Sequence, residues 1–433
     1  MQTRFLPEQL AEPATADAAQ AIRSCVHCGF CTATCPTYVL RGDELDSPRG
    51  RIYLAKGMLE QQALPSAHVV KHVDRCLSCL ACETTCPSGV SYRRVIDKAR
   101  VYIADNYRRP VAERALRSLL AGVLPYPGRL RAALVLAAIA RPFADLFDAV
   151  PALRPLGVMV RMGERRSRAG AADPAATSPT RYRVGMAQGC VEPVVDPEIQ
   201  AATARLLARA GCEVVRVPHE GCCGALSHHM GREAEALAMA RRVVDGWSKA
   251  GDLDAIIITA SGCGTVIRDY GHMLADDPDY AERAARVSAR TCDITEWIAR
   301  IGLPPVAQPR GEIVGYHAAC SLQHGQKIKT PPVQLLEEAG FAVRIPAEAH
   351  LCCGSAGVYN ILQPELADQL AARKVANLGA LEPDVIVTGN IGCIVQIGRA
   401  QARPVVHIAQ LLDWATGGAM PAALAATVAA GSQ

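Results

Sequence analysis

The sequence lacks both a strong excess of charge and a long hydrophobic run. Its 46 basic and 42 acidic residues leave a formal charge of +4, which is too balanced for a nucleic-acid binder. The most apolar stretch, 132–140 (AALVLAAIA), is far shorter than the ~20 residues that span a bilayer. With Arg129, Arg131 and Arg141 beside it, this stretch is expected to form a buried or interfacial helix, and peripheral membrane attachment stays open.

Leader and nucleotide-binding motifs are also missing. The first residues, MQTRFLPEQLAE, have no basic region followed by an apolar run, which favours a reducing compartment. There is no GxGxxG after a strand, no phosphate-binding P-loop and no CxxxCxxC radical motif. An enzyme that oxidises an organic substrate needs a two-electron cofactor such as a flavin. That cofactor is therefore expected on another subunit, and no catalytic residue is predicted on this chain.

Cysteine is the abundant residue, with 18 in a chain of 433 residues. In a reducing compartment so many cysteines favour metal or redox chemistry over disulfides. Eight lie from Cys25 to Cys86 and ten from Cys190 to Cys393, with a helical, proline-broken stretch between the groups. At ~150 residues per domain, this division predicts a first domain, a helical connector with a linker, and two further domains. Their predicted bounds are 1–105, 106–182, 183–305 and 306–433.

The first group contains the run Cys-x2-Cys-x2-Cys-x3-Cys-Pro twice, starting at Cys25 and at Cys76. This is the bacterial ferredoxin run, in which the fourth cysteine binds the neighbouring [4Fe-4S] cluster. A zinc site is the alternative, but zinc usually takes paired Cys-x2-Cys knuckles. Segments 51–61 and 68–73 look helical, which predicts the helical type of two-cluster ferredoxin domain. The predicted ligands are Cys25, Cys28, Cys31 and Cys86 for one cluster, and Cys76, Cys79, Cys82 and Cys35 for the other.

The second group of cysteines is duplicated at an offset of 130 residues. The pairs are Cys190 and Cys320, Cys222 and Cys352, Cys223 and Cys353, and Cys263 and Cys393. The local sequences GCCG at 221–224 and LCCG at 351–354 repeat as well. Cys212 and Cys292 have no counterpart and are predicted to be ordinary buried thiols.

Strands and helices alternate in each copy of this duplication. The predicted strands are 183–188, 213–217 and 255–260 in the first copy, and 312–317, 341–345 and 384–389 in the second. This alternation predicts a parallel sheet covered on both faces, with the repeated cysteines converging beyond the carboxyl ends of its strands. The predicted fold class is a multidomain α+β protein with a helical ferredoxin domain, a helical connector and two duplicated α/β domains.

Two repeats of Cys…Cys-Cys-Gly…Cys resemble the cysteine-rich CCG domain of heterodisulfide reductases and several quinone-linked dehydrogenase subunits. In that family the last element is commonly Cys-x2-Cys, whereas Ala260 and Asn390 replace its first cysteine here. Four thiols per repeat still suffice for one iron-sulfur cluster or one zinc ion, and a redox-inert structural site is the alternative. The candidate metal ligands are Cys190, Cys222, Cys223, Cys263, Cys320, Cys352, Cys353 and Cys393.

Three histidines lie close to these cysteines in the sequence. His317 precedes Cys320, and His228 and His229 follow the first CCG; neither feature is duplicated. Each could tune a cluster, bind zinc or relay a proton. A partly exposed, solvated histidine is the commoner case and is the expectation here.

Residues 23–60, and above all GDELDSPRGRIYL at 42–54, resemble the iron-sulfur subunits of glycolate oxidase. The second cluster motif, the connector and the two CCG repeats extend this resemblance over essentially the whole chain. It implies a complex with FAD-containing subunits that oxidise glycolate to glyoxylate, two [4Fe-4S] clusters that relay the electrons, and a membrane quinone as acceptor. It also implies a cytoplasmic location at the inner face of the membrane.

Several alternatives share these motifs. They are the iron-sulfur subunit of a lactate, D-2-hydroxy-acid or anaerobic glycerol-3-phosphate dehydrogenase, a catalytic subunit like that of heterodisulfide reductase, and a scaffold whose CCG repeats hold zinc. Segment 42–54 argues against the glycerol-3-phosphate enzyme, and the cysteines missing at 260 and 390 argue against disulfide cleavage. Two complete ferredoxin motifs would be hard to explain in a scaffold.

Overall fold

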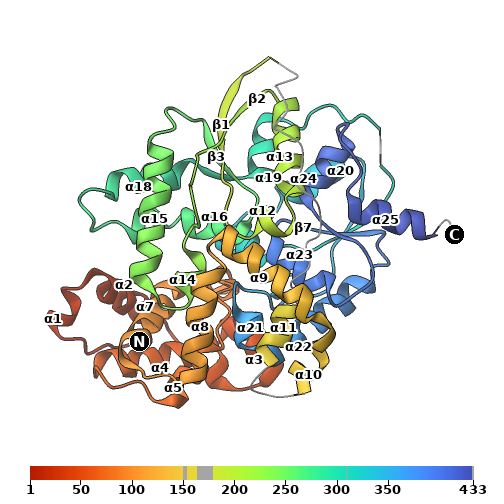
Figure 1. Cartoon of the computed structure of the whole chain (residues 1–433). Coiled ribbons are helices and arrows are strands. Elements are labelled where there is room, and N and C mark those ends of the chain that lie inside the picture. The colour runs from red at the N-terminus through yellow and green to blue at the C-terminus, as the bar shows by residue number, and fades with distance from the viewer. Residues whose placement is uncertain (150–153, 163–178, 309, 432–433) are drawn as a thin grey trace.

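The computed structural model describes residues 1–149, 154–162, 179–308 and 310–431. Figure 1 shows the N-terminal helices at the bottom, the first repeat at the upper left and the second repeat at the right. The predicted linker within 163–182 falls mostly outside the described residues.

The N-terminal module is helical, as the sequence predicted. The core between α2, α4 and α7 contains Ile22, Ile52 and Ile96, each at most 3% exposed. Ser47 and Ser66 accept hydrogen bonds from backbone amides at the starts of α4 and α5, which satisfies donors that the helix leaves free. The helices are α1 (Pro7–Leu10), α2 (Pro13–Ser24), α3 (Pro36–Arg41), α4 (Pro48–Glu60), α5 (Ala67–Asp74), α6 (Ala81–Thr85) and α7 (Tyr92–Asn106).

In the part of the connector that the structure describes, four α-helices lie across both repeats. They are α8 (Val111–Val123), α9 (Pro127–Ala140), α10 (Ala144–Ala149) and α11 (Arg154–Met162). Helix α9 packs against α12 (Glu192–Val195) of the first repeat, and α11 packs against α21 (Tyr359–Leu362) of the second (Figure 1). Among the described residues, no helix has the length and apolar character needed to cross a bilayer.

Each repeat contains a four-stranded parallel sheet, which confirms the predicted class. The first sheet has the order β2-β1-β3-β4 and the second the order β6-β5-β7-β8. The strands are β1 (Tyr182–Met186), β2 (Cys212–Val215), β3 (Ala255–Ile258), β4 (Thr291–Asp293), β5 (Ile313–Tyr316), β6 (Ala342–Arg344), β7 (Val385–Thr388) and β8 (Val405–His407). The sequence analysis did not predict β4 and β8, because three residues carry too little periodicity.

Helices cover the faces of both sheets. In the first repeat they include α13 (Glu198–Arg209), α14 (Ala225–His229), α15 (Glu233–Ser248), α16 (Ser261–Ile267), α17 (Tyr270–Met273), α18 (Ala281–Arg290) and α19 (Ile294–Ile301). In the second they include a π-helix (Ser321–Gly325), α20 (Pro331–Glu338), α22 (Pro364–Gly379), α23 (Ile391–Gly398), α24 (Ile408–Ala415) and α25 (Ala422–Gly431).

The two repeats share one hydrophobic core. Val184 and Ile257 of the first sheet belong to the same buried cluster as Val314 and Val387 of the second. Helix α13 packs on α24, where Arg205 and Arg209 both bind the carboxylate of Asp413, a side chain that is 1% exposed. Because burial of apolar surface drives this packing, the two repeats hold a fixed relation to each other.

Candidate functional site: four groups of thiols

The first ferredoxin group gathers at one surface of the N-terminal module. Cys25, Cys28, Cys31 and Cys86 line one small cavity together with Cys82. Cys28 is exposed and Cys25 is buried. Burial, with Cys25 and Cys35 nearby, raises the pKa of Cys31 to about 11, although Arg49 opposes the shift. These are the four cysteines that the spacing assigned to one cluster.

The second ferredoxin group is buried. Cys35, Cys76, Cys79 and Cys82 are each at most 9% exposed. Burial, and then the nearby thiols of Cys79, Cys76 and Cys35, raise the pKa of Cys82 well above its usual value, so the structure brings the four predicted ligands together. The Cys-x2-Cys loops of both groups follow the same path, because His27 and Ser78, at matching places in the motif, have φ of 58° and 50°.

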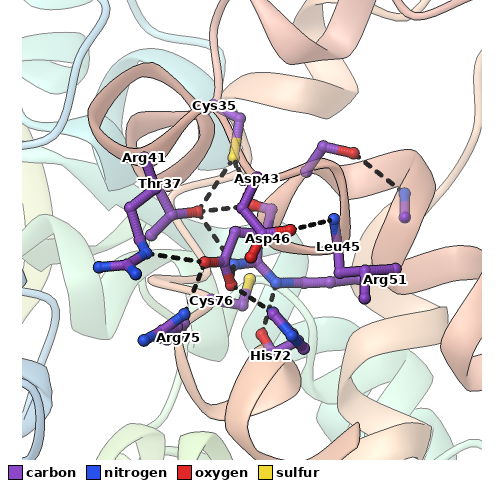
Figure 2. A network of polar contacts seen from close by, with 12 residues as sticks. Cys35, Thr37, Arg41, Asp43, Leu45, Asp46, Arg51, His72, Arg75 and Cys76 are labelled. Carbon is purple, nitrogen blue, oxygen red and sulfur yellow. Dashed lines mark hydrogen bonds and ion pairs between the residues drawn. The ribbon is translucent and has the colours of Figure 1, made fainter. Parts of the chain in front are cut away.

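A buried ionic network holds the second group in place (Figure 2). The fully buried carboxylate of Asp46 lies 2.8 Å from His72 Nδ1 and 2.8 Å from a guanidinium nitrogen of Arg75. Arg51, 2% exposed, donates to the His72 carbonyl at 2.7 Å and to Cys35 Sγ at 3.8 Å. Asp46 and Arg51 belong to segment 42–54, so the part of the sequence that carried the family resemblance supports the second group.

The four CCG thiols of the first repeat form a contiguous set. Cys190 Sγ lies 3.4 Å from Cys222 Sγ, and hydrogen bonds from Cys190 and Cys223 lower the pKa of the Cys222 thiol. Cys263, at the start of α16, contacts Cys223. The structure therefore joins the four cysteines that the duplication singled out.

The second repeat repeats this arrangement. Cys320 Sγ lies 3.7 Å from Cys352 Sγ, while Cys353 interacts with both Cys352 and Cys393. The glycine of each CCG is required by the backbone: Gly224 and Gly354 have φ of 83° and 89°, and a Cβ would lie 2.9 Å and 2.5 Å from helix carbonyls.

The two CCG groups open into one cavity of about 600 Å³. Its floor is formed by both sets of thiols, and apolar residues of α8, α9 and α11 close it, including Leu130, Leu134 and Met159. The cysteines that line it are Cys190, Cys222, Cys223, Cys263, Cys320, Cys352, Cys353 and Cys393.

The groups follow one another through the molecule. Cys31 and Cys35 interact across the two ferredoxin groups, and Cys79 and Cys320 interact between the second ferredoxin group and the second repeat. Cys79 shares a buried apolar cluster with Cys352, and the Thr84 hydroxyl hydrogen-bonds His324 Nδ1 at 2.7 Å across the same boundary. The common cavity then joins the second repeat to the first.

The donor chemistry of these groups fits iron-sulfur clusters. All 18 cysteines lie in the described part of the chain and all are free thiols. Backbone amides point at several sulfurs: Ser78 N lies 3.5 Å from Cys76 Sγ, and Gly354 N lies 3.4 Å from Cys352 Sγ. Such amides stabilise bound thiolates. Cys212 and Cys292 lie apart from the groups, on β2 and β4, and are buried as predicted.

The comparisons with known proteins agree with this geometry. A model of the 4Fe-4S dicluster domain matches residues 24–90, and a model of the cysteine-rich CCG domain matches residues 184–268 and 314–398. The chain is 39% identical to the glycolate oxidase iron-sulfur subunit of Escherichia coli, over 96% of this chain and 99% of that protein. The chain belongs to the family of glycolate oxidase iron-sulfur subunits.

Other relatives share parts of this organisation. A probable glycolate oxidase iron-sulfur subunit of Bacillus subtilis is 32% identical over 91% of this chain and 94% of that protein. Lactate utilization protein A of Exiguobacterium is 28% identical over 52% of this chain and 94% of that protein. A crystal structure of a hypothetical protein from Helicobacter pylori superposes with a TM-score of 0.55 at 9% identity, over 96% of this chain and 74% of that one, which supports the fold alone.

The histidines of this glycolate oxidase subunit differ from expectation. His317 is 1% exposed rather than solvated, because it directly follows β5 inside the second repeat. His228 binds Asp97 of the N-terminal module at 3.1 Å. His229 lines the cavity, and burial followed by the charges of His228 and Arg100 lowers its pKa to about 3. The expectation of solvated side chains was therefore wrong for His317.

Three further buried groups of the subunit were not singled out in the sequence. Glu192 and Glu220 line the cavity beside the first repeat's thiols, and burial raises the pKa of each carboxyl to about 7. Lys374 of α22 is 2% exposed and interacts with the thiols of the second repeat. In the sequence, Glu220 could have been noticed only because it lies next to the first CCG, and Glu192 only because it lies close to Cys190. Nothing in the sequence points to Lys374.

Asn390 shows what replaces one of the missing family cysteines. Its side-chain oxygen accepts from Gly392 N at 2.8 Å, and its nitrogen donates to Ser261 Oγ of the first repeat at 3.0 Å. Ser261 Oγ in turn lies 2.7 Å from Ser321 Oγ. Asn390 therefore caps α23 and ties the two repeats together at the edge of the cavity.

Proposed function

We propose that this glycolate oxidase subunit relays electrons from flavin-containing subunits, which oxidise glycolate, to a membrane quinone. The observation that carries the proposal is the series of four thiol groups that crosses the molecule. Glycolate oxidation to glyoxylate releases two electrons and two protons, and reduction of a quinone to a quinol consumes the same number. Iron-sulfur clusters, held by the two ferredoxin groups and by the CCG groups, supply one-electron carriers between these reactions. No glycolate chemistry is assigned to this chain.

The flavin subunit docks at the first ferredoxin group in this proposal. Cys28 is exposed, and two apolar side chains that line the same small cavity, Val26 and Phe30, are 67% and 64% exposed. Large apolar side chains gathered at a protein surface mark interaction sites. The second group is buried beneath the rest of the chain, so the first is the one that a partner can approach.

The opposite end of the series lies under α9. This helix has apolar residues on all sides: Leu130, Ala133 and Leu134 line the cavity, while Val135 and Ile139, which do not line it, are 61% and 68% exposed. A helix that is apolar all round is normally buried on all sides. We therefore infer that its outer face rests on the lipid surface.

The charges around α9 support a membrane over a second protein as its neighbour. Arg129, Arg131 and Arg141 are exposed beside the apolar face, and the Asp145 carboxylate is paired with Arg161. Exposed arginines bind the anionic headgroups of the cytoplasmic leaflet, while the apolar face of the helix contacts the acyl chains. We therefore propose that the protein attaches peripherally to the inner face of the membrane.

The cavity beneath α9 suits the acceptor. It is lined mainly by apolar side chains, it borders all eight CCG thiols, and its roof is the helix that would touch lipid. Ligand sites of this kind combine an apolar wall with a few polar groups. We therefore place the quinone headgroup here, between the repeats and the membrane.

A reconstituted complex tests the relay. In Cys79→Ser we expect glycolate to bleach the flavin at the normal rate while quinone reduction falls to background. Cys212→Ala is the matched control, since this buried thiol lies outside the four groups and both rates should stay normal. If Cys79→Ser also loses flavin reduction by glycolate, the proposal that this chain acts only in electron transfer after the flavin is contradicted. Lactate as donor tests the nearest alternative, and we expect it to be oxidised far more slowly than glycolate.

Vesicle binding tests the membrane surface. We expect the full complex to sediment with vesicles containing phosphatidylglycerol and to bind pure phosphatidylcholine weakly. Val135→Asp with Ile139→Asp should abolish sedimentation while glycolate-dependent flavin reduction continues. A double variant at exposed apolar side chains of the N-terminal module, Leu6→Asp with Leu64→Asp, serves as the control. Equal binding of the α9 variant and the control would reject the assignment.

A further inference from the structure

His317 is a buried imidazole, and neither of its ring nitrogens has a hydrogen-bond partner among the described residues. Its side chain is 1% exposed, and its backbone N–H donates to the Val387 carbonyl at 2.8 Å, which fixes the residue at the carboxyl end of β5. A buried polar atom left unpaired is energetically unfavourable. The ring therefore requires a partner that none of the described residues provides.

Two thiols stand where that partner would bind. One ring nitrogen of His317, Cys353 Sγ and Cys393 Sγ all lie within 4.8 Å of one another. Ligand atoms on one metal ion, bound at about 2.0 Å for nitrogen and about 2.3 Å for sulfur, lie closer together than the sum of their two bond lengths. The nitrogen and the two sulfurs, which lie within 4.8 Å of one another, would therefore need to move only a short distance to bind one ion. Cys352, which adjoins Cys353, and Cys320 complete the set of donors.

The first repeat has no equivalent donor. At the offset of 130 residues, His317 corresponds to Ala187, whereas all four cysteines have counterparts. In the second repeat Asn390 stands at the place of the family's fifth cysteine, but its side chain is engaged in capping α23 and in binding Ser261. The second repeat thus has, at the end of another strand, an imidazole that the first repeat lacks.

We propose that His317 is a metal ligand, so that the metal centre of the second repeat has thiolate and imidazole ligands while that of the first has thiolates alone. This deepens the proposed function, since it rests on metal binding by the CCG repeats. Imidazole joins thiolates both at zinc and at the irons of some iron-sulfur clusters. One nitrogen in the ligand shell is the shared signature of either metal.

The test uses the full chain, purified anaerobically with and without ¹⁵N-histidine. X-ray absorption at the iron and zinc edges counts nitrogen and sulfur ligands, and pulsed EPR of the reduced protein detects histidine nitrogen coupled to a paramagnetic cluster. We expect one nitrogen ligand at one of the two metals. In His317→Cys we expect the metal per chain to be retained and the nitrogen signature to be lost.

The controls separate the possible failures. His350→Ala, a change at a histidine of the same repeat outside the cluster of donors, should keep the nitrogen signature. Survival of the signature in both His317→Cys and His317→Ala, or shells of sulfur alone at both edges, would overturn the proposal while leaving metal binding intact. If Cys352→Ser and Cys393→Ser leave the metal content unchanged, metal binding by this repeat fails as well.

Discussion

The two CCG repeats have the same strand order and cysteine spacing, yet the groups around their thiols differ in charge. The first repeat has carboxyls beside its thiols, and the second has nitrogen bases. At the offset of 130, the corresponding pairs are Ala187 and His317, Glu192 and Leu322, Glu220 and His350, and Val244 and Lys374. The backbone of the fold therefore determines where the thiols meet, and the flanking side chains give the two sites different electrostatic environments.

The largest effect should come from removing one thiol of each repeat. Cys222→Ser and Cys352→Ser should both reduce quinone reduction to background, because the second repeat adjoins the ferredoxin module and the common cavity joins it to the first repeat. Flavin reduction by glycolate should continue in both, and assembly should be checked by gel filtration. If only Cys222→Ser keeps normal turnover, then the second repeat passes electrons to the quinone directly. In that case the two repeats have different functions.

A smaller effect should follow from removing the buried charge of the second repeat. Burial lowers the pKa of Lys374, and the charges of Cys353 and Cys352 oppose that shift, so the ammonium interacts electrostatically with the site. Loss of a charge interaction of about 1 to 2 kcal/mol corresponds to roughly 40 to 90 mV in a one-electron couple. Lys374→Met should therefore lower one midpoint potential by about that amount in an EPR-monitored titration.

Arg373→Met is the matched control for Lys374→Met. Arg373 is the next residue on α22, but its side chain is 41% exposed and binds Glu348 at the surface. Solvent screening should keep any change in potential much smaller. An equal shift in both variants would mean that the effect comes from a change in the helix or the fold and not from the buried charge near the thiols.

The repeats also differ in how they meet the N-terminal module. The first is joined to it by ionic contacts such as His228 with Asp97, whereas the second is joined by an apolar cluster that includes Leu77 and Tyr359. Burial lowers the pKa of His228, but Asp97 outweighs it and holds the pKa above 6.5. Burial likewise raises the pKa of Asp97, but His228 keeps it below 3.8.

This difference predicts that the contact between the N-terminal module and the first repeat depends on pH, whereas the contact with the second repeat does not. Because the pKa of His228 is raised in the folded state, its ion pair contributes to the free energy of unfolding. This contribution is complete below pH 6.5 and is lost as the pH rises through the folded-state pKa of His228. The contribution from Asp97 is lost only in acid. His228→Asn should destabilise the protein by about 1 kcal/mol below neutral pH and flatten the melting temperature between about pH 6 and 9. His272→Asn, in a pair about 40% exposed, should change the profile little.

The sequence predicted the grouping of thiols and missed their surroundings. Strands, cysteine offsets and ferredoxin spacings are local or periodic, so segments such as 255–260 and the pair Cys222 and Cys352 could be recognised directly. Lys374 lies in a helix whose sequence, AARKVAN, predicts a solvent-exposed segment. Its burial depends on packing against the turn at Glu348, which is distant in the sequence. The placement of α9 over both CCG groups is likewise a long-range contact that composition does not encode.

The smallest expected effect concerns the helix that contains the last cysteine of each repeat. Asn390 caps α23, whereas Ala260, at the same place before α16, offers no side-chain cap. Loss of a cap costs about 1 kcal/mol. Asn390→Ala should therefore lower the free energy of unfolding by about that amount, and by more if the bond to Ser261 also contributes.

The reciprocal change, Ala260→Ser, should raise stability by up to about 1 kcal/mol, because a hydroxyl at this place can accept from the free amides of α16. Both variants are measured by chemical denaturation of the anaerobic protein, with metal content determined in parallel. If Asn390→Ala releases metal without changing stability, then Asn390 acts at the metal centre itself, and the second repeat differs from the first in its ligands at two places and not at His317 alone.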